Sequence, residues 1–443
     1  MAVPKVNGLD FAGDLCGFVR GSGSALYVLG STAKGAYVFT YDLAKKGFVI
    51  AQPVPLPHPD CLDGKCPSVP DPGSLPWLCK GVRVPVGDKD RLYLIDGKGA
   101  GGQTQTTSYP MVSLEMIPAG GGKFLKLHLL NESPFLTGKR LFRGIEVFEN
   151  ALYLLEPSWS KQLEDDAKKA GVPAQAAIHK VPLHPVSGLP EWDKRTAFSA
   201  GQGKEKCEGS TPLVPAFAKV SIGGAERLVV GNDAALGVYD FEGQALGEVD
   251  LLPYGRLAVA AAVSPDGQSL FVLPGCKSAK LKAKVKLGIG TKTLALDRHA
   301  VMVLDLAGAL PTVRDAERDF DEDGVADGGV DLDFLHLKRD LLRWCEPCSG
   351  VVPPTVYTGP ALVATAKALI LRGTGASVTS SGLGQVGDLG VFDLQTGKGL
   401  VFRKHSLWLD GPSARWGFDI QPEVAAKTPQ FDQSVSALLY VAP

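Results

Sequence analysis

The chain has 443 residues, of which 45% are hydrophobic and 21% are charged, and its formal net charge is −1 at pH 7. This composition supplies enough apolar side chains for a sizeable core and excludes a chain that is disordered by composition. A net charge near zero argues against general nucleic-acid binding, because that activity requires a basic face. The chain has no apolar run of about eighteen residues, which is the length a membrane-spanning helix needs.

The N-terminus and the cysteines bear on the cellular compartment. Residues 1–14 lack the apolar stretch of a secretory signal, so we expect either a cytosolic protein or one whose leader is absent from the printed sequence. The eight cysteines include close pairs and favour disulfides, with Cys61 and Cys66 the best candidate pair because Asp63 and Gly64 predict a turn between them. Eight free thiols in a cytosolic protein is the alternative. We therefore predict an extracytoplasmic protein, in the periplasm, at the cell surface or secreted.

Two strand patterns recur along the chain. The first is a short apolar strand, rich in β-branched or aromatic residues, that runs into glycine or proline. It occurs at residues 25–30, 91–97, 151–157, 227–233, 269–275, 368–375 and 437–443. The second ends in aspartate before a turn, at residues 37–43, 236–243, 300–308 and 389–397. An aspartate at that position can accept hydrogen bonds from the following backbone amides, which stops the strand and starts a hairpin.

Three insertions interrupt these repeats. Residues 53–79 are rich in proline and cysteine and predict a loop, because proline cannot donate to a sheet. Residues 158–172 predict a short helix that ends at Gly171. Residues 315–350 contain an aspartate-rich loop followed by a helical apolar pattern over 330–344.

Lysines alternate with apolar residues after the fifth strand repeat. The lysines are Lys280, Lys282, Lys284 and Lys286, and the alternation predicts a half-buried strand with a lysine face. Such a face is either a charged edge that resists sheet-to-sheet aggregation or a contact for a polyanion, such as an acidic glycan or a lipid headgroup.

The aspartate-rich loop has the spacing of a calcium site. Asp319, Asp321 and Asp323 occupy alternate positions and are followed by Gly324 and Asp327. Calcium takes six to eight oxygen ligands, and a tightly curled loop brings its first, third and fifth side chains to one point. The alternative is a solvated acidic turn that caps the following helix.

This spacing resembles the calcium loops of EF-hand, dockerin and thrombospondin type 3 repeats. The resemblance implies that the Val325 carbonyl and Asp327 fill the seventh and ninth positions. It also implies a bidentate glutamate at the twelfth position, where this chain has Val330, so Asp331 or Asp333 would take that role. The ligands expected for calcium are Asp319, Asp321, Asp323, Val325, Asp327 and Asp331.

Other chemical motifs are weaker. Residues 344–348 read WCEPC and resemble the redox motif of thioredoxins, but they follow a predicted helix, so we expect a local disulfide. Residues 382–387 satisfy GxGxxG, but a strand follows them where a nucleotide site needs a helix, so we predict a glycine-rich loop. His179 and His184 are expected to be a poor pair for one metal. The sequence therefore assigns no catalytic residue.

The segment VSPDGQSLFVL, residues 263–273, resembles the recurrent segment of YVTN, lactonase-like and WD40-like β-propellers. The aspartate-ending strands resemble the same superfamily. The resemblance implies an all-β fold, and the seven strand repeats predict a single seven-bladed β-propeller over residues 1–443, with six or eight blades as alternatives. The N-terminal segment is then expected to complete the last blade.

These expectations favour a function that uses inserted loops. We expect a calcium-stabilised binding or adhesion module, or a subunit of a surface assembly, with a protein or glycan partner. The alternative is a propeller-class hydrolase or lactonase with its active site at the tunnel mouth. The sequence identifies neither the partner nor the oligomeric state.

Overall fold

The computed structural model describes residues 14–32, 35–49, 54–55, 78–96, 111–118, 124–129, 135, 140–201, 215–232, 235–251, 256–276, 280–287, 290–297, 300–314, 329–331, 362–365, 368–379, 382–393, 399–404, 407–408 and 415–416. The helices in these ranges are α1 (Lys161–Ala170) and the 3-10 helix η3 (Trp192–Lys194), and most of the remainder is β-strand. The chain divides into two compact units, Met1–Glu205 with Phe241–Gly243, and Lys206–Asp240 with Gln244–Pro443.

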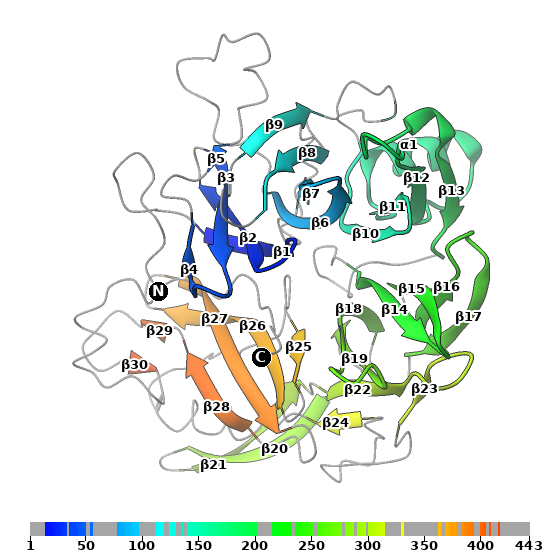
Figure 1. Cartoon of the computed structure of the whole chain (residues 1–443). Helices are drawn as coiled ribbons and strands as arrows, with labels where there is room; N and C mark the ends of the chain where they lie inside the picture. The colour runs from blue at the N-terminus through cyan, green and yellow to red at the C-terminus, as the bar shows by residue number, and fades with distance from the viewer. Residues whose placement is uncertain are drawn as a thin grey trace. The chain divides into compact units, whose positions relative to one another are not determined.

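The first unit contains three antiparallel sheets whose strands follow one another in chain order (Figure 1). The first sheet consists of β1 (Asp14–Arg20), β2 (Ala25–Thr32), β3 (Gly35–Asp42) and β4 (Gly47–Phe48), with β5 (Val54–Pro55) also paired to β3. The second consists of β6 (Leu78–Val86), β7 (Lys89–Asp96), β8 (Met111–Met116) and β9 (Phe124–Leu129). The third consists of β10 (Gly144–Phe148), β11 (Ala151–Glu156), β12 (Ala177–Pro182) and β13 (Thr196–Ser199).

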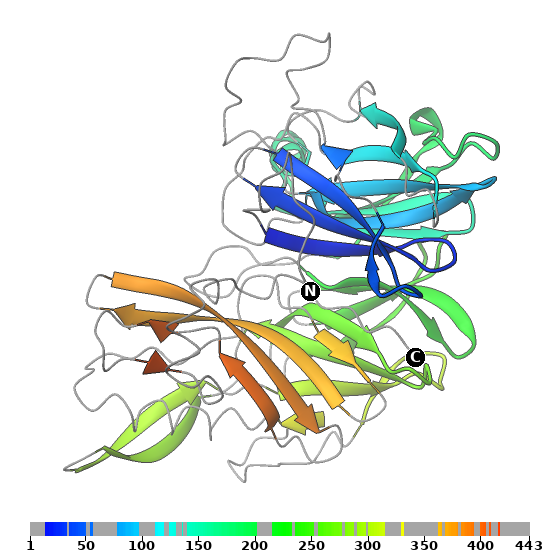
Figure 2. The same cartoon turned by 60° about the vertical axis from the view of Figure 1, so that its left-hand side comes forward.

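The second unit repeats this plan (Figure 2). Its fourth sheet consists of β14 (Phe217–Ile222), β15 (Ala225–Gly231), β16 (Ala235–Tyr239) and β17 (Ala245–Asp250). The fifth consists of β18 (Arg256–Val263), β19 (Ser269–Cys276), β22 (Ala300–Asp305) and β23 (Thr312–Val313), with β24 (Gly329–Asp331) also paired to β22. The sixth consists of β25 (Leu362–Ala364), β26 (Ala368–Thr379), β27 (Gly382–Asp393) and β28 (Gly399–Lys404). Two separate pairs are β20 (Lys280–Leu287) with β21 (Gly290–Asp297), and β29 (Leu407–Trp408) with β30 (Arg415–Trp416).

The two sequence patterns occupy fixed places in these sheets. The first six apolar repeats form the second strand of each sheet, namely β2, β7, β11, β15, β19 and β26. The aspartate-ending repeats form the third strands β3, β16, β22 and β27. Successive four-stranded antiparallel sheets are the arrangement of β-propeller blades, so the all-β, propeller-like fold is confirmed. Residues 1–13 and the seventh repeat lie outside the described residues, and the number of blades and ring closure stay predictions.

The central residues of the second strand β7 are apolar without alternation because they are buried on both faces. In β7, Leu92 and Leu94 pack in a cluster with residues of the first sheet, whereas Tyr93 and Ile95 pack in a cluster with residues of the third. All four side chains have no exposed surface. A strand that is solvated on one face would alternate apolar with polar residues.

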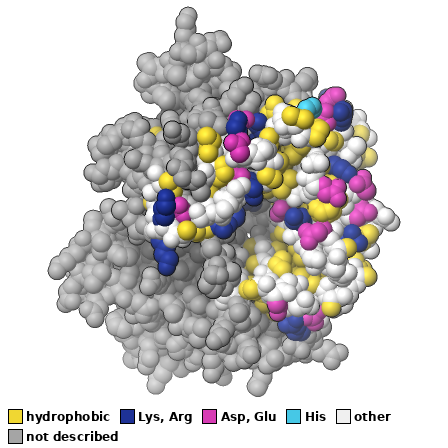
Figure 3. Space-filling model, viewed as in Figure 1, with side chains coloured by type: hydrophobic (Ala, Val, Ile, Leu, Met, Phe, Trp, Pro, Cys, Tyr) yellow, Lys and Arg dark blue, Asp and Glu magenta, His cyan; other side chains and the backbone are white. Residues whose placement is uncertain are grey.

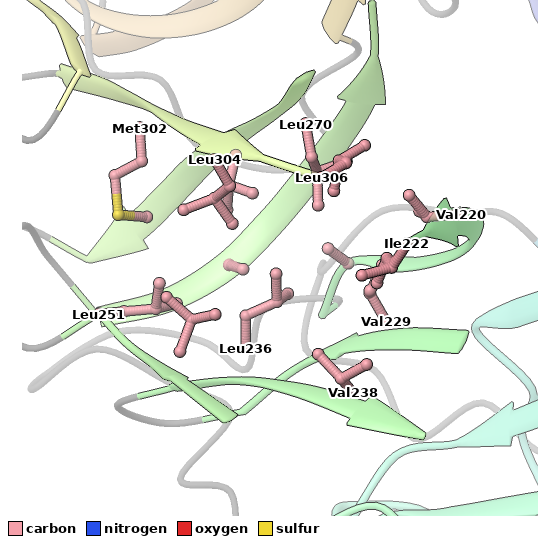
Figure 4. Close-up of a cluster of buried hydrophobic side chains, with 14 residues drawn as sticks. Val220, Ile222, Val229, Leu236, Val238, Leu251, Leu270, Met302, Leu304 and Leu306 are labelled. Carbon is pink, nitrogen blue, oxygen red and sulfur yellow. The ribbon is translucent and has the colours of Figure 1, made fainter. Parts of the chain in front are cut away.

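The core of the second unit is built in the same way. Apolar side chains from β14, β15 and β16 face those from β19 and β22, as Figure 4 shows for Val229, Leu236 and Leu304. The members of this cluster are all nearly inaccessible to solvent. Burying one such side chain contributes roughly 1.5–3 kcal/mol, so the free energy of folding comes largely from the packing between neighbouring sheets.

The predicted turn chemistry is present where third strands end. Asp42 Oδ1 accepts hydrogen bonds from the backbone amides of Ala44 (2.9 Å) and Lys45 (3.2 Å). Asp240 Oδ1 accepts one from the amide of Gln244 (2.8 Å). Each carboxylate thus accepts hydrogen bonds from the amides of the turn that follows, which ends the strand at that point.

Three buried tyrosines of the first unit form hydrogen bonds outside their own sheets. Tyr27, Tyr93 and Tyr153 are each the third residue of the apolar repeat, in β2, β7 and β11, and each is almost fully buried. Their hydroxyls donate outside their own sheets, Tyr27 to Asp90 Oδ2 (2.8 Å), Tyr93 to the Gly188 carbonyl, and Tyr153 to the Phe241 carbonyl (3.0 Å). A buried hydroxyl needs such a partner, so these bonds favour one alignment of neighbouring sheets.

Gly188 illustrates how closely the second and third sheets approach. Its φ of +66° lies in the left-handed region, and a Cβ at this position would lie 2.7 Å from Cγ2 of Val86. Both conditions favour glycine, which lets the carbonyl of this residue reach Tyr93.

Asp90 is the most heavily bonded of these acceptors. Its buried carboxylate accepts hydrogen bonds from the Ser22 amide (2.9 Å) and hydroxyl (2.6 Å), from Tyr27, and from Arg83 Nε (2.7 Å). Burial raises the pKa of the Asp90 carboxyl, but these hydrogen bonds together lower it by more than burial raises it. The net pKa therefore lies below the usual value. Burial together with the Asp90 bond and charge raises the pKa of the Tyr27 phenol.

We predict that Asp90→Asn lowers the free energy of unfolding by about 2–3 kcal/mol at pH 7, because Arg83 loses its buried counter-charge. Because the folded-state pKa of Asp90 is lowered, its stabilising contribution is present above the unfolded pKa, about 3.9, and is lost as the pH falls through the folded pKa. Urea unfolding at pH 7 and at pH 3 measures both effects. The exposed Asp88→Asn is the matched control, and an equal loss of stability in both variants would contradict the role assigned to Asp90.

Candidate functional site

The connections between strands fall into two geometric classes. In an antiparallel sheet with strands in chain order, the connection from the second to the third strand and the one that leaves the fourth strand lie at the same end. We call this the loop end. The connections from the first to the second strand and from the third to the fourth lie at the opposite end, the turn end.

Long connections gather at the loop ends. At the turn ends, the longest connection is 183–195, and most are short turns such as 87–88 and 149–150. Longer connections leave the loop ends, at residues 56–77, 97–110, 130–143, 157–176, 200–216, 277–299 and 332–361. A further insertion, 314–328, interrupts the outer strand of the fifth sheet between β23 and β24. Because loops on a rigid scaffold commonly carry binding residues, the loop ends of each unit are candidate functional surfaces.

Glu156 anchors two loop-end connections of the third sheet. It is the last residue of β11, and its carboxylate is fully buried. Its Oε2 accepts a hydrogen bond from Arg140 (2.6 Å) in the connection before β10, and its Oε1 accepts one from the Ser160 hydroxyl (2.6 Å) at the start of α1. His179 Nε2 of β12 lies 2.8 Å from Oε2. One carboxylate thus joins two connections to the sheet.

The insertion at 158–172 contains α1, and Glu156 influences how this helix begins. Ser160 is the N-cap residue but makes no side-chain bond to the helix amides, because its hydroxyl is directed to Glu156. At the other end, Gly171 adopts a left-handed conformation with φ of 69°, and its amide bonds the carbonyl of Lys168. None of the helix residues is buried, so α1 presents its side chains to solvent.

Aromatic and cationic side chains enclose the His179–Glu156 pair. The ring of Phe135 lies 4.9 Å from that of His179, and the guanidinium groups of Arg140 and Arg195 lie 4.2 Å and 4.1 Å from the centre of the Phe135 ring. Nε2 of His179 and Oε2 of Glu156 are within hydrogen-bond distance, and the tautomer of the imidazole decides which nitrogen of His179 can donate. Among the described residues, Nδ1 has no partner. With both carboxylate oxygens bonded and no exposed surface, Glu156 acts here as a cross-link.

The expected calcium ligands lie mostly outside the described residues, namely Asp319, Asp321, Asp323, Val325 and Asp327. Asp331 is the last residue of β24, and its backbone pairs with Ala300 at the start of β22. The calcium site therefore stays a prediction.

The structure nevertheless defines where that insertion begins and ends. Val313 of β23 pairs with Leu304, and Gly329 of β24 pairs with Met302. The two ends are thus held two β22 residues apart, about 7 Å at the rise of a strand. Arg314 reinforces the first end by donating to Asp305 and to the Ser269 hydroxyl (2.8 Å). Ends held this close suit the tightly curled loop that a calcium ion needs.

Other predicted features have different outcomes. Cys345 and Cys348 and most of 53–79 lie outside the described residues. Residues 382–387 form the first half of β27, paired with β26, so the prediction of a glycine-rich loop was wrong, because pairing with β26 extends the hairpin to Thr379. His184 Nδ1 accepts hydrogen bonds from the backbone amides of Val186 (3.3 Å) and Ser187 (3.2 Å) in its own turn.

Within the described ranges, no three His, Cys, Asp or Glu side chains come together as a metal site would require. No described helix has the length and apolar character to cross a membrane. Acidic and basic side chains are mixed on the described surface of the face in Figure 3, as expected for a net charge near zero.

Comparisons with known proteins give structural similarities only. No family model matches the chain, and no curated protein matches it. Among solved structures, a functionally unknown protein from Desulfotomaculum acetoxidans DSM 771 is 13% identical, with 92% of this chain and 89% of that chain covered and a TM-score of 0.36. The Dos1 propeller is 9% identical, with 59% and 68% covered and a TM-score of 0.31. One of two prolyl endopeptidases is 13% identical, with 87% and 41% covered and a TM-score of 0.34.

We predict that Glu156→Gln lowers the free energy of unfolding by about 3 kcal/mol, because Arg140 loses its buried counter-charge. Hydrogen exchange should accelerate in α1 and in residues 140–143 under conditions where β11 stays protected, because these connections lose their shared anchor. Mass-spectrometric exchange checks this. The exposed Glu164→Gln on α1 is the control, and unchanged exchange in Glu156→Gln would show that the carboxylate does not anchor the connections.

Proposed function

We propose that the protein is an extracytoplasmic, seven-bladed β-propeller that serves as a binding or adhesion module or as a subunit of a surface assembly. It presents its loop-end insertions to a protein or glycan partner. The observation that carries this proposal is the gathering of the long connections at the loop ends. The turn ends keep short connections, which is the asymmetry expected when one end of a scaffold is used for recognition.

The interior of the first unit supports a preorganised binding surface. The carboxylate of Glu156 holds the segment before β10 through Arg140 and the segment after β11 through Ser160. A connection that is already ordered loses less conformational entropy when it binds a partner. Rigid anchoring of exposed loops therefore favours binding over a purely structural role.

We predict that binding depends on the loop ends. The intact protein is screened on an array of defined glycans and against a displayed peptide library. For a ligand found there, the α1 variant Glu164→Lys/Lys168→Glu should weaken binding at least tenfold, because charges that contact a partner become repulsive. The turn-end variant Lys45→Glu/Lys46→Glu is the control and should bind within twofold of the wild type.

Two results would contradict this function. One is a ligand whose affinity depends on the turn-end lysines and not on any loop-end insertion. The other is turnover of ester or lactone substrates by the purified protein together with no ligand in either screen, which would favour the propeller-class hydrolase.

Calcium is the proposed structural cofactor. The ligands are those of the aspartate loop, Asp319, Asp321, Asp323, the Val325 carbonyl and Asp327, with Asp331 completing the site. The support is the alternate spacing of the aspartates together with the closely held ends of the insertion. An ion there would also relieve the repulsion among six aspartates and one glutamate in residues 318–334.

We predict that calcium raises the melting temperature and that EDTA reverses the rise. At a calcium concentration one hundred times the dissociation constant, binding stabilises the fold by about 2.7 kcal/mol. Asp321→Asn/Asp323→Asn should abolish the calcium response, whereas the exposed Asp193→Asn should keep it. Thermal denaturation with and without EDTA, combined with elemental analysis, measures this, and a wild-type melting curve indifferent to EDTA would reject the site.

A further inference from the structure

The fifth sheet carries a basic β-hairpin in one of its loop-end connections. The connection from β19 to β22, residues 277–299, contains β20 and β21, which form a two-stranded sheet of their own (Figure 2). The same residues contain six lysines and one arginine but only one aspartate, in a chain of net charge −1. Among the described strands, neither β20 nor β21 pairs with a third.

The register of this hairpin separates charge from apolar residues. Residues opposite one another in an antiparallel pair share a face. One face holds the pairs Lys280 with Asp297, Lys282 with Ala295, Lys284 with Thr293, and Lys286 with Thr291. The other holds Leu281 with Leu296, Ala283 with Leu294, Val285 with Lys292, and Leu287 with Gly290. The hairpin is therefore an amphipathic ribbon with one cationic and one largely apolar face.

This arrangement exceeds what protection of a sheet edge requires. One or two charged residues are enough to stop an edge strand from pairing with another chain. Here four lysine positions follow one another at about 6.6 Å along a single face. Such a row of like charges is unfavourable in the isolated protein and becomes favourable beside an anionic partner.

We propose that the β20–β21 hairpin docks on an anionic lipid surface. Its lysine positions contact the charged headgroups, and its apolar positions enter the boundary between headgroups and acyl chains. A bilayer accommodates both faces of the ribbon, whereas an anionic polysaccharide would use only the lysine face. This role goes beyond the protein or glycan binding proposed above and depends neither on calcium nor on α1.

The test uses the full chain and sedimentation with vesicles of phosphatidylcholine alone or mixed with phosphatidylglycerol. We expect binding to the anionic vesicles only, and weaker binding as the salt concentration rises. Each lysine near an anionic surface changes the affinity by about fivefold, so Lys282→Gln/Lys284→Gln should weaken binding at least tenfold. Lys282→Arg/Lys284→Arg should retain it, and Leu281→Ser should weaken it without altering the charge.

The matched control is Lys45→Gln/Lys46→Gln, which removes the same charge from an exposed turn end and should bind within twofold of the wild type. A melting curve like that of the wild type confirms that each variant is folded. An equal loss of binding in the control pair would overturn the proposal, as would no binding to anionic vesicles. Binding to a soluble sulfated polysaccharide without vesicle binding would assign the hairpin to a different partner. Vesicle binding that emerges only in Asp319→Asn/Asp321→Asn/Asp323→Asn would mean that the acidic segment of this chain occupies the lysine face.

Discussion

The burial of strands on both faces is the constraint on which the rest of the structure depends. Tyr93 and Leu94 are neighbours in β7, yet they pack in clusters with different sheets, and neither has exposed surface. A four-stranded sheet of this kind cannot bury its own second strand, because both faces of that strand must be covered by neighbouring sheets. The free energy that holds a sheet together is therefore largely shared with the next one, and folding of the sheets within a unit is expected to be cooperative.

Polar groups add alignment to this packing. The hydrophobic effect is non-directional, whereas a buried hydroxyl has a favourable energy only where an acceptor meets it. Tyr27 and Tyr93 impose this condition between sheets of the first unit. The corresponding positions of β15, β19 and β26 are Val229, Phe271 and Ile370, which carry no hydroxyl. Side chains at those positions therefore cannot donate such a hydrogen bond.

The repeated strands could be predicted because their pattern reflects burial directly. The run ALYVLG and its relatives are apolar without alternation, and six of them are second strands. The helix at Lys161–Ala170 lies inside the insertion 158–172, where Gly171 marks its end.

The Glu156 cluster was not predictable in full. A glutamate that ends an otherwise apolar strand, in ALYLLE, is a signal that a buried charge needs partners. Arg140, Ser160 and His179 could not be assigned as those partners, because they come from three separate elements whose proximity depends on tertiary packing. For the same reason the glycines of 382–387 were misleading, since the pairing with β26 decides their conformation.

The divided outer strand of the fifth sheet has a further consequence. β23 and β24 each pair with β22 and not with one another. The number of residues between them therefore does not decide which side chains of either strand face the core. Residues can be gained or lost in that interval without moving the side chains of either strand to the opposite face of the sheet. The length of this interval can therefore follow the spacing of ligands that a cation needs, without any change in the alternation of the sheet.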